Sequence, residues 1–93
     1  MKNWFSVSLC HGGLLGGIIV FEADAIYYRT GKLTVSPRLR NLEMRYADVI
    51  SIEEGKVFPT VTLGMQNGES FTFLVFSRRR FVTLLKEKTA KGV

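Results

Sequence analysis

Short runs of alternating hydrophobic and polar residues follow one another along this chain, and turn-forming residues separate them. Seven such runs stand at the spacing of about 8–12 residues that is typical of all-β barrels and sandwiches. They cover residues 3–10, 14–21, 25–30, 42–46, 48–54, 60–66 and 69–76. The clearest alternation places Leu42, Met44 and Tyr46 on one face, because successive strand residues point to opposite sides. A corner at Ala47–Asp48 separates this run from the next.

The last two runs flank an Asn-Gly pair, which predicts a β-hairpin. A two-residue turn would place Leu63 opposite Thr72, so that the apolar residues of the two strands would lie on different faces. A three-residue loop, 66–68, pairs Leu63 with Phe71 and brings the apolar residues to one face, as register normally requires. We therefore predict the three-residue loop, with Gly68 in the left-handed backbone region.

Residues 77–89 have the spacing of an amphipathic helix, because apolar residues recur at i, i+3 and i+4. The apolar stripe consists of Phe81, Leu84 and Leu85, and the stem of Lys88 extends it. Ser77 is expected to cap the helix. Phe76 and Phe81 occupy the two positions of a hydrophobic staple. We expect the helix to dock its apolar face over an open end or seam of the β structure.

The predicted fold class is therefore mainly β with one C-terminal α-helix, in a single domain covering residues 1–93. A chain of 93 residues buries only about 60–65% of the surface that its unfolded form exposes, which favours a compact shape. We expect a β-barrel or a strongly bent sandwich, with about seven antiparallel strands in two bent sheets capped by the helix.

Composition indicates an ordinary globular protein, with 46% hydrophobic and 23% charged residues. The one cysteine, Cys10, excludes an intrachain disulfide and favours a reducing compartment. The longest apolar run, 14–21, contains two glycines and is far shorter than the roughly 20 residues that a membrane-spanning helix needs. We therefore expect a cytoplasmic domain that can associate peripherally with a membrane.

The net charge of +5 is unevenly distributed along the chain. Residues 1–76 contain seven basic and seven acidic groups, whereas residues 77–93 contain six basic groups and one acidic group. A second basic cluster lies within residues 29–45, and acidic residues gather within 46–69. Such a polarised field favours anionic partners in general and does not choose among membrane, nucleic acid and acidic protein.

The residue types of catalysis and metal binding do not form a predicted site. Cys10 and His11 are neighbours whose side chains point to opposite faces of a strand, so they do not form a thiolate–imidazole pair. Glu53 and Glu54 diverge in the same way, and we interpret them with Asp48 as a solvated acidic edge. We predict a protein that is not an enzyme and has no cofactor, metal site or small-molecule substrate.

Three segments together resemble the GRAM and bacterial pleckstrin-homology-like families. They are "GGIIVFEADAIYYR" (residues 17–29 with the preceding glycine), "LEMRYADVISIEE" (42–54) and "VTLGMQNGESFTFLVFSRRRFVTLL" (61–85). The resemblance implies a PH-like β-barrel and a binding module. Phosphoinositide-binding members usually carry basic residues in the loop between their first two strands. Here that loop reads "CHGGLLGG" and has no Lys or Arg, so the resemblance does not imply an inositol-phosphate pocket there.

The candidate binding residues are instead the basic side chains after the third strand and at the start of the helix. They are Lys32, Arg38, Arg40, Arg45, Arg78, Arg79 and Arg80. The first hypothesis is weak association with a membrane surface or anionic lipid. The second is a protein-interaction or oligomerisation module that meets an acidic partner or another copy of the chain. Nucleic acid is less favoured, because Phe71 and Phe73 fall on the predicted core face and leave only Tyr27 or Tyr28 for base stacking.

The three successive arginines at the helix start allow two interpretations. A helix N-terminus carries partial positive charge, so each arginine there loses about 0.3–1 kcal/mol at low salt. Because successive helical residues are about 100° apart, the three side chains do not all face one partner. One or two of them pair with Asp48, Glu53 or Glu54 in the structural interpretation, and they contact an anion in the functional one.

Overall fold

The computed structural model describes residues 3–10, 13–31 and 41–89, and these contain seven strands, a short 3-10 helix and one α-helix. The strands are β1 (Trp4–Cys10), β2 (Leu14–Phe21), β3 (Ala25–Arg29), β4 (Asn41–Arg45), β5 (Val49–Glu54), β6 (Thr60–Met65) and β7 (Ser70–Leu74). The 3-10 helix η1 (Tyr46–Asp48) forms the corner predicted between two strands, and α2 (Arg78–Thr89) follows β7. The prediction of a mainly β chain with seven antiparallel strands and one C-terminal helix is confirmed.

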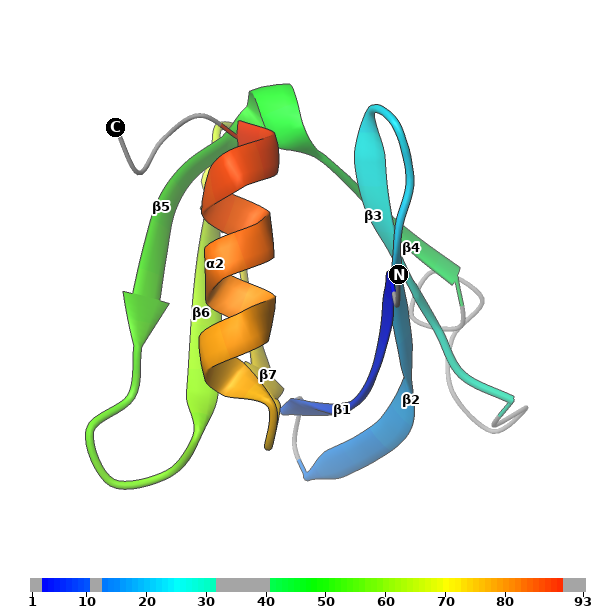
Figure 1. The fold of residues 1–93 in the computed structure, drawn as a ribbon, viewed down its shortest axis with the longest axis vertical. Helices are drawn as coiled ribbons and strands as arrows, with labels where there is room; N and C mark the ends of the chain where they lie inside the picture. The colour runs from blue at the N-terminus through cyan, green and yellow to red at the C-terminus, as the bar shows by residue number, and fades with distance from the viewer. Residues whose placement is uncertain (1–2, 11–12, 32–40, 90–93) are drawn as a thin grey trace.

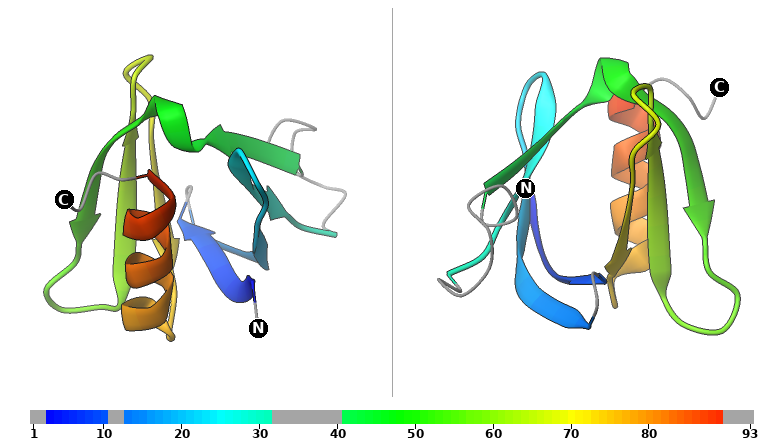
Figure 2. Two further views of the ribbon diagram at one scale, coloured as in Figure 1. Left: turned by 45° about the horizontal axis from the view of Figure 1, so that its top comes forward. Right: turned by 180° about the vertical axis from the view of Figure 1, so that it is seen from behind.

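All seven strands lie in one antiparallel sheet in the order β4-β3-β2-β1-β7-β6-β5. The prediction of two bent sheets is therefore corrected to one sheet, and the reason is β1. It pairs with β2 from Trp4 to Cys10 and also pairs with β7 at Ser8 and Leu9, so it joins the two halves. Within the described residues the end strands β4 and β5 do not pair with each other, so the sheet is not closed. The sheet folds over so that its halves face each other, with α2 beside the β6 half (Figures 1 and 2).

The core occupies the space between the two halves of the sheet. Leu42, Met44 and Tyr46 are buried, as the alternation along this run predicted. Phe5 of β1, Phe21 of β2 and Phe81 of α2 form an edge-to-face cluster. Their ring centroids are 5.3 to 5.6 Å apart. Such contacts add about 0.5–1.5 kcal/mol per pair beyond the area they bury, so this cluster fixes the helix against both β1 and β2.

The β6–β7 hairpin has the predicted three-residue loop. The Met65 amide donates to the Glu69 carbonyl at 2.8 Å, and Gly68 has a positive φ of 91°. Leu63 stands opposite Phe71, as predicted, so the apolar residues of both strands share the inner face.

Helix α2 agrees with the predicted range except at its entry. The Ser77 carbonyl accepts the first helical bond from the Phe81 amide at 3.1 Å, which is the backbone arrangement of an N-cap. Phe81 and Leu85 are buried, and Val82, which the predicted stripe did not include, is buried as well. The predicted staple is wrong, since Phe76 is 83% exposed. Val75 continues the inward alternation of β7 and is fully buried, so Phe76 points outward.

Candidate functional site

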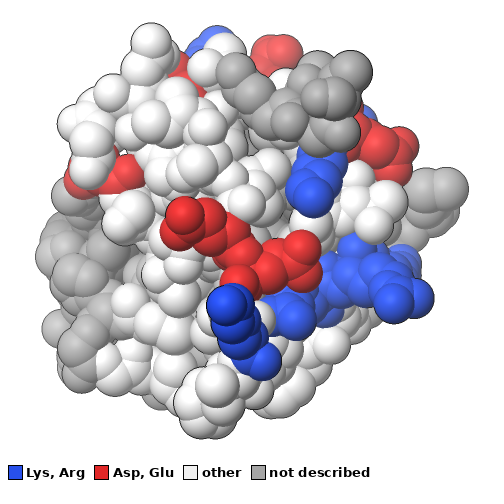
Figure 3. Space-filling view, turned by 90° about the vertical axis from the view of Figure 1, so that its left-hand side faces the viewer, with Lys and Arg blue, Asp and Glu red and all other residues white. Residues whose placement is uncertain are grey.

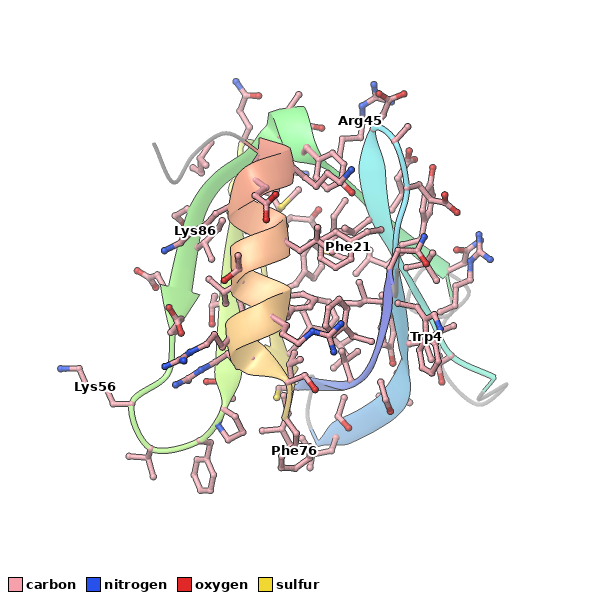
Figure 4. All side chains as sticks on the ribbon, in the orientation of Figure 1. Trp4, Phe21, Arg45, Lys56, Phe76 and Lys86 are labelled. Carbon is pink, nitrogen blue, oxygen red and sulfur yellow. The ribbon has the colours of Figure 1, made fainter. Side chains whose placement is uncertain are left out.

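The structure separates the basic residues that the sequence grouped together. Arg45 ends β4 at one end of the molecule, whereas Arg78, Arg79 and Arg80 begin α2 near Phe76 at the opposite end (Figure 4). Lys32, Arg38 and Arg40 lie outside the described residues. The candidate site that can be built from the structure is therefore the end of the molecule where α2 starts.

Arg78 connects the start of α2 to the loop between β5 and β6. Its Nη1 donates to three carbonyl oxygens of this segment, and its Nε lies 3.3 Å from Oε1 of Glu54. The three acceptors are Gly55 at 2.6 Å, Phe58 at 3.2 Å and Thr60 at 3.4 Å. A single guanidinium thus satisfies carbonyls along the loop and compensates one carboxylate. This confirms that one of the three arginines pairs with a predicted acidic residue.

A second link fixes the same loop to the strand that precedes α2. The Val75 amide donates to the Pro59 carbonyl at 2.8 Å. Inside the loop, the Gly55 amide donates to the Thr60 carbonyl at 2.9 Å. The β5–β6 loop is consequently held from both sides, and the position of its outer residues relative to α2 is defined.

Arg80 faces a different part of the molecule. Its guanidinium carbon lies 5.8 Å from the centroid of the Phe5 ring, within the range of a cation–π contact. Arg79 lines a groove of about 520 Å³ between α2 and the end of β5, together with Thr83 and Lys86. The three arginines therefore diverge, as their helical spacing predicts. Among the described residues, Arg78 and Arg80 contact other side chains or carbonyls, whereas the Arg79 side chain lines the groove and makes no such contact.

The groove beside α2, which we call the basic groove, carries net positive charge. It is lined by Glu54, Pro59, Phe76, Arg78, Arg79, Val82, Thr83 and Lys86. Glu54 is paired with Arg78, whereas within the described part of the chain neither the Arg79 nor the Lys86 side chain makes a hydrogen bond or ion pair. Figure 3 shows this side of the molecule, where basic side chains lie around a central acidic group. An anion approaching the groove therefore meets two exposed cations whose side chains have no partner among the described residues.

Exposed apolar side chains surround the same end of the molecule. Val57 is 84% exposed, Phe58 is 68% exposed and Phe76 is 83% exposed. We call these three residues the apolar tip.

The sequence analysis did not select Lys86, Lys56 or the apolar tip. Lys86 could have been found from its position seven residues after Arg79, which places both on one helix face. The apolar pair before Pro59 was also visible, because it lies outside the predicted strands.

A second hollow lies on the open side of the sheet, between β4 and the β6–β7 hairpin. It measures about 560 Å³, and its charged lining residues are Glu43, Arg45, Asp48 and Glu69. Acidic groups outnumber the basic one, so this hollow is not a continuation of the basic groove. No group of three or more His, Cys, Asp or Glu side chains in the described ranges is placed to hold a metal ion.

The remaining sequence candidates have structural roles in the described residues. Tyr28 is buried, its hydroxyl donates to the Leu15 carbonyl at 2.7 Å, and burial raises the pKa of this tyrosine. Tyr27 donates to Glu43 at 3.3 Å and lies under the guanidinium of Arg29. Phe73 is buried and Phe71 is half-buried, in agreement with their predicted position on the core face. His11, which follows Cys10 in the sequence, lies outside the described residues.

Tyr46 shows how the corner η1 is fixed at the far end of the core. Its hydroxyl donates to the Glu22 carbonyl at 2.7 Å. Burial, with the nearby charges of Glu22 and Asp24, raises the pKa of Tyr46 to about 12. The phenol therefore stays neutral at physiological pH and acts as a hydrogen-bond donor between η1 and the β2–β3 turn.

No helix within residues 3–10, 13–31 and 41–89 is long and apolar enough to cross a membrane. No protein-family model matches the chain, and no curated protein matches its sequence. Among solved structures, the chain is similar to the C-terminal domain of an unknown protein from Leishmania infantum, determined by crystallography. The TM-score is 0.79 at 12% sequence identity, over 98% of this chain and 84% of the other. This likeness concerns the fold alone.

Proposed function

We propose that this chain is a non-catalytic binding module of the GRAM or pleckstrin-homology-like type. Two observations support the proposal. Seven antiparallel strands precede a single docked helix, which is the element order of that superfold. Residues 17–29, 42–54 and 61–85 resemble the corresponding segments of these families. Because such folds serve many partners, the ligand has to be argued from the surface.

The ligand we propose is the surface of a membrane that contains anionic lipid, bound weakly and on its cytoplasmic side. The observation that carries this proposal is the basic groove, where Arg79 and Lys86 are exposed and make no internal ion pair within the described residues. Each Lys or Arg close to an anionic membrane surface contributes about 1 kcal/mol of attraction. The groove residues therefore supply a weak, salt-sensitive affinity, consistent with a module that acts inside a larger assembly.

A pair of charge reversals at opposite ends of the molecule tests this proposal. Arg79→Glu changes the charge in the groove by two, so we expect binding to phosphatidylserine vesicles to weaken by about 2 kcal/mol, or roughly 30-fold. The thermal melt should stay level or rise, because a carboxylate near a helix N-terminus is favoured by the helix dipole. Arg45→Glu is the matched control at the other end and should leave vesicle binding largely intact. Equal binding by both variants would remove the groove from the site.

A second candidate function, protein interaction or self-association, is favoured by the edge of the sheet. Strand β5 ends the strand order and carries Ile50, whose side chain is 59% exposed. An unpaired edge presents backbone donors and acceptors to which another strand can add. Light scattering without lipid separates this candidate from the first, since self-association raises the molar mass in solution and membrane binding alone does not.

A further inference from the structure

Val57, Phe58 and Phe76 come from two segments that the structure holds together at one end of the molecule. Val57 and Phe58 lie in the β5–β6 loop, and Phe76 lies between β7 and α2. The link between the segments is the bond from the Val75 amide to the Pro59 carbonyl, so each phenylalanine neighbours one of the two bonded residues. Exposed apolar residues scattered singly are normal on a soluble protein, but a gathered group indicates an interaction site.

The exposure of the apolar tip indicates which kind of partner can bury its side chains. Each of the three side chains is more than two-thirds exposed, so they protrude from the surface, although Phe76 also lines the basic groove. A rigid protein partner would need a complementary concavity to bury them, whereas a lipid interface deforms around protruding side chains. The loop that presents Val57 and Phe58 is fixed by Arg78, which limits the collapse of these two side chains onto the protein.

The charges around the apolar tip match the same partner. Lys56 precedes Val57 in the chain, and Phe76 lines the basic groove together with Arg79 and Lys86. Figure 4 shows Lys56 and Phe76 at the lower end of the molecule and Lys86 higher along α2. Apolar side chains that are flanked by cations are typical of segments that lie in the interface of an anionic bilayer.

We propose that the apolar tip inserts into the headgroup–acyl boundary of a bilayer containing anionic lipid, with Arg78 as the positioning residue of the inserted loop. This inference rests on the proposed function and adds a second contribution to it. The cations of the basic groove attract the protein to the surface, and Val57, Phe58 and Phe76 then leave water. Lys56 and Arg79 remain at the level of the lipid phosphates, and Lys86 lies farther along α2 above them. Binding at high salt is therefore weakened but not abolished, because burial of apolar area is not screened.

Vesicle sedimentation of serine variants tests the insertion. We expect Phe58→Ser and Phe76→Ser each to weaken binding to phosphatidylserine vesicles by about tenfold, because each change removes the apolar area that the phenylalanine buries in the bilayer. The melts should be unchanged, because both side chains are exposed. Ile50→Ser is the matched control: it removes an exposed apolar side chain from β5, outside the tip, and should bind like the unchanged protein.

A fluorescence measurement reports the insertion directly. The chain has one tryptophan, Trp4, which lies away from the tip in Figure 4. In a Trp4→Phe background, the tryptophan introduced by Phe76→Trp should shift to shorter wavelength and be quenched by brominated acyl chains. Normal binding by the Phe58→Ser/Phe76→Ser double variant, or absence of quenching, would overturn the insertion while the proposed function stands. Failure of the unchanged protein to bind any anionic vesicle would overturn both.

Discussion

Arg78, Arg79 and Arg80 are chemically identical neighbours, yet each guanidinium has different surroundings. Arg78 donates to the β5–β6 loop and pairs with Glu54, Arg80 lies over the Phe5 ring, and Arg79 lines the basic groove. The sequence predicted from helical spacing that the three side chains diverge, and the pairing of one or two of them with an acidic residue was one of the two interpretations that it left open. It did not predict which arginine does so, because the loop carbonyls that select Arg78 converge only in the folded chain.

Alanine substitutions distinguish the structural arginine from its neighbour. Arg78→Ala removes the charged donor from the carbonyls of Gly55, Phe58 and Thr60, and we expect the free energy of unfolding to fall by about 1–2 kcal/mol. Arg79→Ala removes no side-chain bond to another described residue and relieves an unfavourable interaction with the helix dipole, so the stability of this variant should be unchanged or slightly higher. Urea denaturation of the two variants provides the measurement, and equal stabilities would contradict the bracing role of Arg78.

At the level of elements, the strands were predictable because burial follows residue parity. Leu63 and Phe71 could be paired from the sequence since only one loop length brings both apolar sets to the same face. The staple failed for a related reason. The sequence matched Phe76 to Phe81 by their positions around the helix cap, but the alternation that buries Phe73 and Val75 turns Phe76 outward. That outward turn also places Phe76 in the apolar tip, which no local pattern indicated.

Glycine-to-valine substitutions test the hairpin geometry. Gly68 has a φ of 91° and open space around its Cβ position, so any cost of Gly68→Val comes from the backbone. A β-branched residue in this region should lower the free energy of unfolding by about 1–2 kcal/mol. Gly16→Val is the matched control, because Gly16 also has open space but lies in strand β2 without a positive φ. We expect no destabilisation there, and a similar loss in both variants would contradict the positive-φ explanation.

At the scale of the whole molecule, the fold decides which basic residues lie close together. The sequence placed the basic residues in two segments and did not indicate how these segments meet. In the structure Arg45 and the arginines of α2 lie at opposite ends, and Lys86 joins Arg79 instead. The sequence also did not predict that all strands form one sheet. That topology depends on β1, which pairs with β2 along its whole length and with β7 only at Ser8 and Leu9. Long-range pairing of this kind leaves no periodic signal in the chain.

The central claim is that the end of the molecule where α2 starts binds an anionic membrane surface. The most direct measurement is sedimentation of the unchanged protein with neutral vesicles and with vesicles containing phosphatidylserine, at low and at high salt. We predict that the bound fraction rises with phosphatidylserine content and falls with salt, because the attraction comes from exposed cations. Binding that is the same for neutral and anionic vesicles, or no binding to either at low salt, would contradict the claim.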